Sequence, residues 1–167
     1  RRHTRSDRDW SSDVCSSDLE SKRQLAFATA VIENSPIVVV RWKAEGAFLK
    51  AEYISSNVSQ FNYLAANIGD GTVAYTDLVL PEDLQKASEE VVFNLSHHID
   101  DFTQEYRIRT GTGEIRWIQT HKQVIRKKTG EIDYIQGTLL DISDRVEAEA
   151  QRRLVVEQLQ SVVDTID

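Results

Sequence analysis

The fold is decided by residues 102–143, which read FTQEYRIRTGTGEIRWIQTHKQVIRKKTGEIDYIQGTLLDIS. In the first segment, apolar Phe102, Tyr106 and Ile108 alternate with charged residues, which is the period of a half-buried strand. Turns containing Gly113 and Gly130 separate this segment from two further strand-like segments. The stretch therefore predicts an antiparallel sheet whose last strand passes, at Asp141-Ile142-Ser143, directly into a helical pattern.

The last strand, over residues 131–140, is apolar on both faces. Ile132 and Tyr134 lie on one face, whereas Ile135 lies on the other. A central strand whose outer side is also covered tolerates that pattern. The aliphatic run Ile37–Val40 has the same character. We therefore expect the first and last strands to lie side by side in the middle of a five-stranded antiparallel sheet.

The remaining elements complete an α+β domain. Residues 20–34 predict a helix that ends at Ser35-Pro36, because proline disfavours helical geometry in the residue before it. Residues 37–42 and 48–55 predict a hairpin. Residues 57–95 predict short helices across one face of the sheet, and the longest begins at Pro81, a residue that suits a first helical turn.

The pattern after residue 143 predicts a second flanking helix over residues 144–167. Val155, Leu159, Val162 and Ile166 follow one another at spacings typical of a coiled-coil seam. The alternative is an amphipathic helix that packs back on its own domain.

Composition excludes several classes of function. A net charge of −7 and the lack of a long basic cluster argue against a nucleic-acid partner. The longest aliphatic run is too short for the roughly 20 apolar residues of a membrane-spanning helix, so no membrane contact is expected. A single cysteine, Cys15, permits no internal disulfide and predicts a cytoplasmic protein.

The chain also carries marks of a fragment with an added tail. It contains no methionine, and it ends inside a helical pattern. Residues 9–19, DWSSDVCSSDL, resemble a translated sequencing adapter. We therefore expect residues 1–19 to be a non-native, disordered tail, in which case Cys15 has no biological role.

The chain from about Glu33 to Arg145 resembles a PAS domain of the subtype common in bacterial multi-domain sensors, with the domain itself placed at residues 35–143. The resemblance rests on short strings in a fixed order: ENSP at 33–36, YISSNV at 53–58, PED at 81–83, EYRI at 105–108, GEIRWI at 113–118, and DIS at 141–143. The chain departs from the common pattern at Leu80, where relatives often carry histidine, and at Thr112, which replaces an acidic turn residue. The resemblance implies the same central pairing of first and last strands.

The resemblance implies a non-catalytic sensory and dimerising module placed before a histidine kinase or diguanylate cyclase output domain in the same chain. A PAS core can enclose a small-molecule ligand. The candidate lining residues are Phe61, Leu64, Tyr75, Leu78, Val92, Leu95, Tyr106, Ile108 and Trp117. The alternative is simple core packing, since aromatic and aliphatic residues at these spacings fill the core of most domains.

No cofactor or catalytic centre is expected. A flavin photosensor of the LOV type needs a reactive cysteine beside its pocket, and residues 20–167 contain none. His97 and His98 read as a solvated helix end rather than haem ligands, and with Asp100 and Asp101 they lack a further partner for a metal. His121 reads as an ordinary strand histidine, and hydrolase, metalloprotease and phosphate-loop motifs are missing.

The sites expected to relay a signal lie at the strand-to-helix junction. Asp141, Ile142 and Ser143 would pin the junction, with Asp141 paired to Arg107, Arg116 or Arg145. The flanking helices would form a homodimer. The alternative is a ligand-independent scaffold that only dimerises through the same helices.

Overall fold

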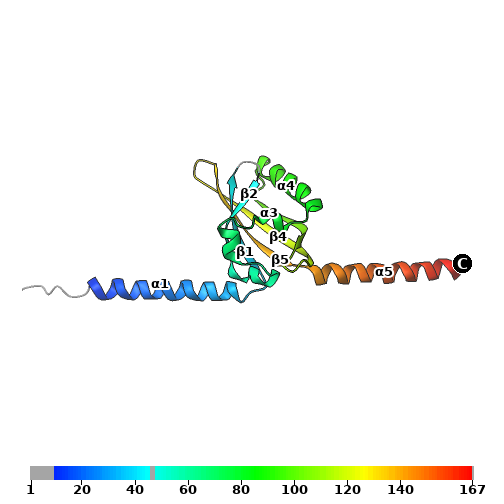
Figure 1. The fold of residues 1–167 in the computed structure, drawn as a ribbon, viewed down its shortest axis with the longest axis horizontal. Helices are drawn as coiled ribbons and strands as arrows, with labels where there is room; N and C mark the ends of the chain where they lie inside the picture. The colour runs from blue at the N-terminus through cyan, green and yellow to red at the C-terminus, as the bar shows by residue number, and fades with distance from the viewer. Residues whose placement is uncertain (1–9, 46–47, 167) are drawn as a thin grey trace, which may run out of the picture.

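The computed structural model describes residues 10–45 and 48–166. Five antiparallel strands form one sheet, in the order β2-β1-β5-β4-β3 (Figure 1). The strands are β1 (Val38–Glu45), β2 (Phe48–Ile54), β3 (Asp101–Arg109), β4 (Ile115–Arg126) and β5 (Ile132–Asp141). The expected five-stranded α+β fold, with its first and last strands adjacent near the centre, is confirmed.

The pairing of β1 with β5 depends on a glycine. Val40 lies opposite Gly137, and Trp42 lies opposite Ile135. A Cβ atom at Gly137 would stand 2.2 Å from the carbonyl oxygen of His121 and 3.0 Å from the Trp42 ring. Glycine is therefore required here because the β4 backbone and the Trp42 side chain fill the space.

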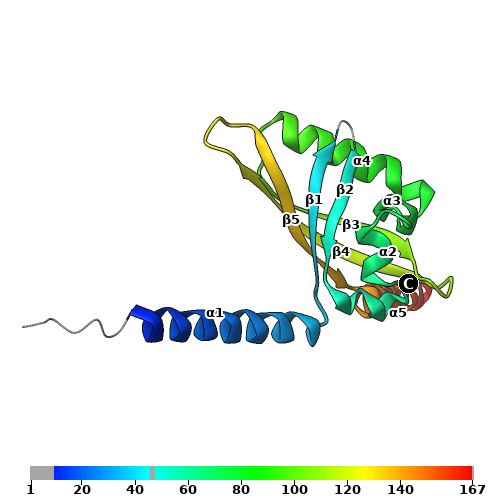
Figure 2. The ribbon, with the colours of Figure 1, turned by 60° about the vertical axis from the view of Figure 1, so that its left-hand side comes forward.

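Three short helices and the longer α4 cover one face of the sheet, here called its inner face (Figure 2). They are η1 (Ser56–Phe61), α2 (Ala65–Gly69), α3 (Tyr75–Leu78) and α4 (Pro81–Ser96). As expected, α4 begins at Pro81 and carries two acidic residues in its first turn. Inward-facing residues of β1, β3, β4 and β5 form one core with Val58, Phe61, Leu78 and Val91 of the helical layer.

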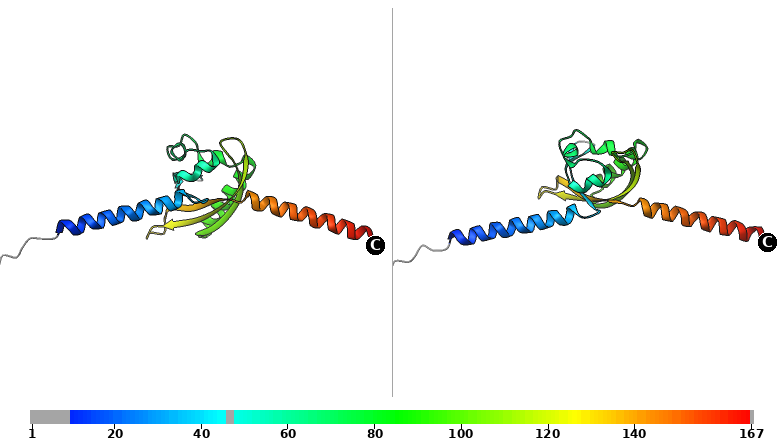
Figure 3. Two further views of the ribbon diagram at one scale, coloured as in Figure 1. Left: turned by 90° about the horizontal axis from the view of Figure 1, so that it is seen from below. Right: turned by 60° about the horizontal axis from the view of Figure 1, so that its bottom comes forward.

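The flanking helices project from the domain. Helices α1 (Trp10–Glu33) and α5 (Ser143–Ile166) leave near the same end of the domain and point away from each other (Figures 1 and 3). No residue of α5 is buried. The alternative in which α5 packs back on its own domain is therefore wrong.

Helix α1 begins earlier than expected. The sequence predicted a helix over 20–34 after a disordered tail, but the helix already starts at Trp10. No proline or glycine interrupts residues 10–34, so a helix formed at its later turns can extend backwards. Residues 1–9 lie outside the described residues, and the non-native origin of residues 1–19 stays a prediction.

Asn57 ties the end of α1 to the domain. Its Nδ2 lies 2.8–3.0 Å from the carbonyl oxygens of Ile32, Ser35 and Ile37. Its Oδ1 accepts a hydrogen bond from the buried Ser55 hydroxyl at 2.5 Å. The entry of the chain into β1 is therefore fixed by side-chain hydrogen bonds.

Among residues 10–45 and 48–166, the search for a membrane-spanning helix found no candidate of sufficient length and apolar character.

Candidate functional site

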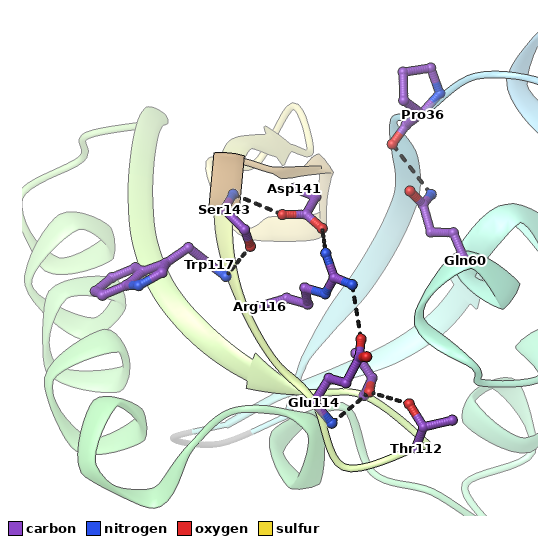
Figure 4. A network of polar contacts seen from close by, with 9 residues as sticks. Pro36, Gln60, Thr112, Glu114, Arg116, Trp117, Asp141 and Ser143 are labelled. Atoms are coloured by element: carbon purple, nitrogen blue, oxygen red, sulfur yellow. Dashed lines mark hydrogen bonds and ion pairs between the residues drawn. The ribbon is translucent and has the colours of Figure 1, made fainter. Parts of the chain in front are cut away.

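The first candidate site is the junction between β5 and α5. The Trp117 N–H on β4 donates to the Ser143 hydroxyl at 2.9 Å (Figure 4). The Ile142 N–H donates to the Trp117 carbonyl at 2.8 Å. The Ser143 N–H in turn donates to Asp141 Oδ1 at 2.9 Å. The first turn of α5 is thus hydrogen-bonded to the sheet, with only Ile142, itself buried, between strand and helix.

Arg116 is the arginine that meets Asp141. Its Nη1 lies 3.7 Å from Asp141 Oδ2, and its Nη2 donates to Glu114 at 2.8 Å (Figure 4). The neighbouring carboxylates raise the pKa of Arg116, chiefly through the hydrogen bond to Glu114. One of the three expected pairings is therefore present.

The other two arginines hold different elements. Arg107 on β3 donates through Nε and Nη2 to the two carboxylate oxygens of Asp83 on α4, at 2.9 and 2.6 Å. This hydrogen bonding holds the pKa of Asp83 below its usual value. Arg145 on α5 donates to Glu105 on β3 at 2.6 Å and, with the Gln119 side chain, lowers the Glu105 pKa. Arg107 therefore anchors α4, and Arg145 adds a second link between α5 and the sheet.

The second candidate site is a cavity of about 50 Å³ between the sheet and the helical layer. Its walls come from β1 to β4, from α3 and from α4. Tyr75 on α3 and Tyr106 on β3 line it, and their hydroxyl oxygens are 2.7 Å apart. Burial raises the pKa of both phenols, that of Tyr106 to about 12. The cavity is therefore lined by neutral hydroxyl groups, by apolar groups and by one lysine.

That lysine, Lys122, lies inside the core. It is 4% exposed, and its Nζ donates to Gln104 Oε1 at 2.5 Å. The Gln104 amide donates to the Glu90 carboxylate on α4 at 2.9 Å. Burial lowers the pKa of Lys122 to about 8. A hydrogen-bonded chain thus connects the buried amine to a partly exposed carboxylate.

The structure divides the nine residues proposed to line a pocket. Tyr75 and Tyr106 line the cavity, while Phe61, Leu78 and Ile108 are buried core residues and Leu95 packs on the edge of the core. Leu64 and Val92 are 65% and 50% exposed and lie outside it. Val92 faces outward because the neighbouring Val91 takes the inward position on α4.

Trp117 lies on the outer face of the sheet. The Arg107 guanidinium stands 5.6 Å from the centre of its ring. Residues 118, 120, 122 and 124 are the buried positions of β4, so Trp117, of opposite parity, points away from the cavity.

Among the lining residues that the sequence analysis missed, Trp42 and Lys122 bring an indole N–H and an amine to the cavity wall. Lys122 shares strand parity with Ile118 and Val124, so the alternation of β4 places a lysine on the buried face. That signal was available in the sequence. Trp42 gave no comparable signal, because it lies in a strand with apolar residues on both faces.

The histidines take part in local contacts. His97 Nδ1 lies 2.8 Å from the Phe93 carbonyl oxygen at the end of α4, and His121 Nε2 lies 2.8 Å from Asp101 Oδ1. Within residues 10–45 and 48–166, histidine, cysteine and acidic side chains do not gather in a group of three that could hold a metal. That the chain binds neither haem nor a metal stays a prediction from the sequence.

Curated relatives are sensor proteins. The chain is 34% identical over 119 residues, 71% of its length, to a methyl sulfide methyltransferase-associated sensor of Methanosarcina acetivorans. It is 34% identical over 87 residues, 50% of its length, to a blue-light-activated histidine kinase of Brucella ovis. The matches span 12% and 16% of these relatives, so the chain corresponds to a small part of each.

Solved structures share the fold. A sensory box histidine kinase/response regulator of Burkholderia thailandensis aligns with a TM-score of 0.61 and 24% identity, over 83% of this chain and 98% of that chain. The N-terminal domain of a diguanylate cyclase with a PAS/PAC sensor from Marinobacter aquaeolei aligns with a TM-score of 0.54 and 20% identity, over 65% of this chain and 97% of that chain.

The family follows from sequence and structure together. The central pairing of β1 and β5, the helical layer over one face and the Asp141-Ile142-Ser143 junction agree with the resemblance found in the sequence. Residues 51–139, more than half of the chain, match the PAS fold family. The chain therefore belongs to the PAS family, as a domain of the kind found in sensor histidine kinases and diguanylate cyclases.

Proposed function

We propose that this chain is a non-catalytic sensory module that passes a change in its core through α5 to an output domain further along the same protein. The junction supports this proposal most directly. The sheet that forms the wall of the cavity is hydrogen-bonded to the first turn of α5 through Trp117 and Ser143. A shift of β4 or β5 therefore acts on the helix without an intervening flexible loop.

The outputs of the relatives support the kind of protein involved. Sensor kinases and a diguanylate cyclase carry domains of this fold. We propose that the output here is of the same class, a histidine kinase or a diguanylate cyclase. The stimulus is proposed to be chemical rather than a LOV-type flavin reaction, because the single cysteine, Cys15, lies in α1 outside the sheet and its helical layer.

The test uses the chain fused before a histidine kinase output domain. Asp141→Ala removes the acceptor for the Ser143 N–H and one of the two carboxylates that Arg116 meets, so we expect the domain to stay folded while autophosphorylation no longer depends on the sensory domain. Asp133→Ala removes an exposed carboxylate from the same strand and serves as the control. Normal regulation in the Asp141→Ala fusion would rule out the relay.

A second candidate function is a dimerising scaffold without sensing. Its supporting observation is the row of exposed apolar side chains on α5, where Val155, Leu159, Val162 and Ile166 are 54–80% exposed. Removal of α1 and α5 separates the two functions. A truncated domain that is monomeric and still binds a small molecule favours the sensor, whereas loss of dimerisation as the sole effect favours the scaffold.

A further inference from the structure

Residues that line the cavity carry hydrogen-bond donors, and one of these donors lacks an acceptor in the part of the chain that the structure describes. Trp42 is completely buried, and its Nε1–H finds no hydrogen-bond partner among the described residues. Tyr75 and Tyr106 share one hydrogen bond between two hydroxyl groups, and the buried Thr120 hydroxyl is the neighbouring group for the second phenol hydrogen, so the indole N–H is the donor without an acceptor in residues 10–45 and 48–166. Buried donors of this kind are normally satisfied, which points to a missing acceptor.

Lys122 adds a positive charge with unused donors. An ammonium group has three N–H donors, and within the described part of the chain one of them is used, by Gln104. The faces of Trp42 and Tyr106 stand 5.4 and 5.6 Å from Nζ. Glu90, which attracts the charge, bonds to Gln104 rather than to Lys122. A buried cation held in this way favours an anion as its missing partner.

The rest of the lining sets the size and character of the ligand. The volume of about 50 Å³ holds about three to five atoms of water size, at about 10–15 Å³ each. Val79, Leu84, Ala87 and Val91 supply apolar lining, and Thr76 and Ser88 add two hydroxyl groups. The site therefore suits a very small anion that has two acceptor oxygens on one side and an apolar group on the other.

We propose that this cavity binds a short carboxylate, of the size of formate or acetate, with its oxygens on Lys122 Nζ and Trp42 Nε1. The proposal rests on the sensory function proposed above and names its ligand class. The same pocket gives a route for the signal. Lys122 lies on β4, the strand whose Trp117 holds the first turn of α5.

Binding should depend on pH in one direction. The pKa of Lys122 is lowered to about 8, and the titratable groups that surround it are Glu90 on α4, Tyr75 on α3 and Tyr106 on β3. Both phenols stay neutral at this pH, since burial raises the pKa of each. Carboxylate affinity should therefore fall as the pH rises above about 8, where the amine loses its proton.

The experiment titrates the folded chain with sodium acetate at constant ionic strength and follows the Trp42 indole N–H by NMR. We expect a saturable shift of that resonance and a rise in the melting temperature, with no saturable effect of sodium chloride or of neutral acetamide. Lys122→Met, which removes the charge at similar side-chain length, should weaken acetate binding by about tenfold or more. Lys127→Met, an exposed site at the end of the same strand, should bind as the parent does.

The controls keep the outcome decisive. Trp42→Phe keeps an aromatic ring but removes Nε1–H, so it should also weaken acetate binding, and it tests the site independently if Lys122→Met is poorly folded. Because this variant lacks the indole resonance, its binding is followed by the melting temperature. The proposal is overturned if the parent chain shows no saturable shift. It is also overturned if Lys122→Met and Trp42→Phe both bind acetate as tightly as the parent chain does.

The fusion protein separates this ligand from the sensory function. Acetate binding without any change in kinase output would contradict the sensor but not the site. Output that depends on Asp141 in a chain that ignores acetate would contradict the ligand class but not the sensor.

Discussion

At the scale of single residues, the burial of Lys122 makes the free energy of unfolding depend on pH. Its pKa is lowered by burial from an ordinary value of 10.5 to about 8, so between these values the unfolded chain binds more protons than the folded chain. The free energy of unfolding must then rise with pH in this interval. The buried phenols act in the opposite direction only above about pH 10, because their pKa values are raised in the folded state.

The first prediction follows from that sign. From about pH 8 to pH 10 the free energy of unfolding should increase by about 2–3 kcal/mol more in the parent chain than in Lys122→Met. Urea denaturation at several pH values measures the difference. Equal pH slopes for the two proteins would show that the amine is not desolvated in the folded state.

Gly137 provides a second prediction at this scale. A methyl group there meets the His121 carbonyl carbon and oxygen of the neighbouring strand, so Gly137→Ala should cost about 3 kcal/mol or more and disturb the pairing of β5 with β4. Gly69→Ala is the matched control, since it lies in α2 with no atom within 4 Å of the added carbon. Alanine there should be neutral or stabilising by about 0.5–1 kcal/mol, because glycine is a poor helix former. Thermal or urea denaturation of both variants and of the parent chain measures these changes in stability.

At the scale of elements, the ion pair between Asp83 and Arg107 fixes α4 on the edge strand β3. Asp83 is within hydrogen-bonding distance of three Arg107 nitrogens, including the backbone N–H at 2.8 Å. A bidentate arginine contact of this kind holds a helix in a defined orientation as well as adding stability. The position of α4 matters because this helix closes one side of the cavity.

We expect Asp83→Ala to lower the free energy of unfolding by about 1–3 kcal/mol, since it leaves the Arg107 backbone N–H and guanidinium without their acceptor. Glu82→Ala, which removes the exposed neighbouring acid, should have a much smaller effect. The contribution of Asp83 should disappear in acid, because its lowered pKa means that stability is lost as the pH falls through the folded-state value. Denaturation curves at neutral and acid pH test both statements.

At the scale of the whole molecule, the two projecting helices give the chain an extended shape. The domain sits between α1 and α5, which extend from it to opposite sides (Figure 3). The apolar side chains of α5 find no partner in their own domain: Leu159 and Val162 are 62% and 58% exposed. A second copy of the helix is the simplest partner that buries such a seam.

Leu159→Glu should therefore shift the chain toward the monomer, because it places a charge in the seam. Gln158→Glu adds the same charge one position away, outside the 155-159-162-166 row, and should leave association largely unchanged. Sedimentation velocity over a range of concentrations measures the difference. Identical association of the two variants would exclude α5 as the dimer contact.

Particular residues show which features of the fold and of the site could be predicted from the sequence. The apolar pattern on both faces of two strands predicted that β1 lies beside β5, Pro81 predicted the start of α4, and the order of short strings indicated the family. The assignment of Val92 and Trp117 to a pocket was less successful, because it relied on residue type and ignored the faces that helical and strand periods impose. Lys122 was overlooked although its parity placed it inside.

The sequence by itself determined the elements, their central pairing and the direct passage from β5 into α5, because these follow from local periodicity and turn chemistry. Only the tertiary structure decided which arginine meets Asp141, which side chains enclose the cavity, and that α5 stands free of its own domain. Those outcomes depend on contacts between residues far apart in the chain. Arg107 pairs with Asp83 and Arg145 pairs with Glu105 because sheet register and helix docking bring those groups together. Local sequence patterns do not predict which of these distant residues come into contact.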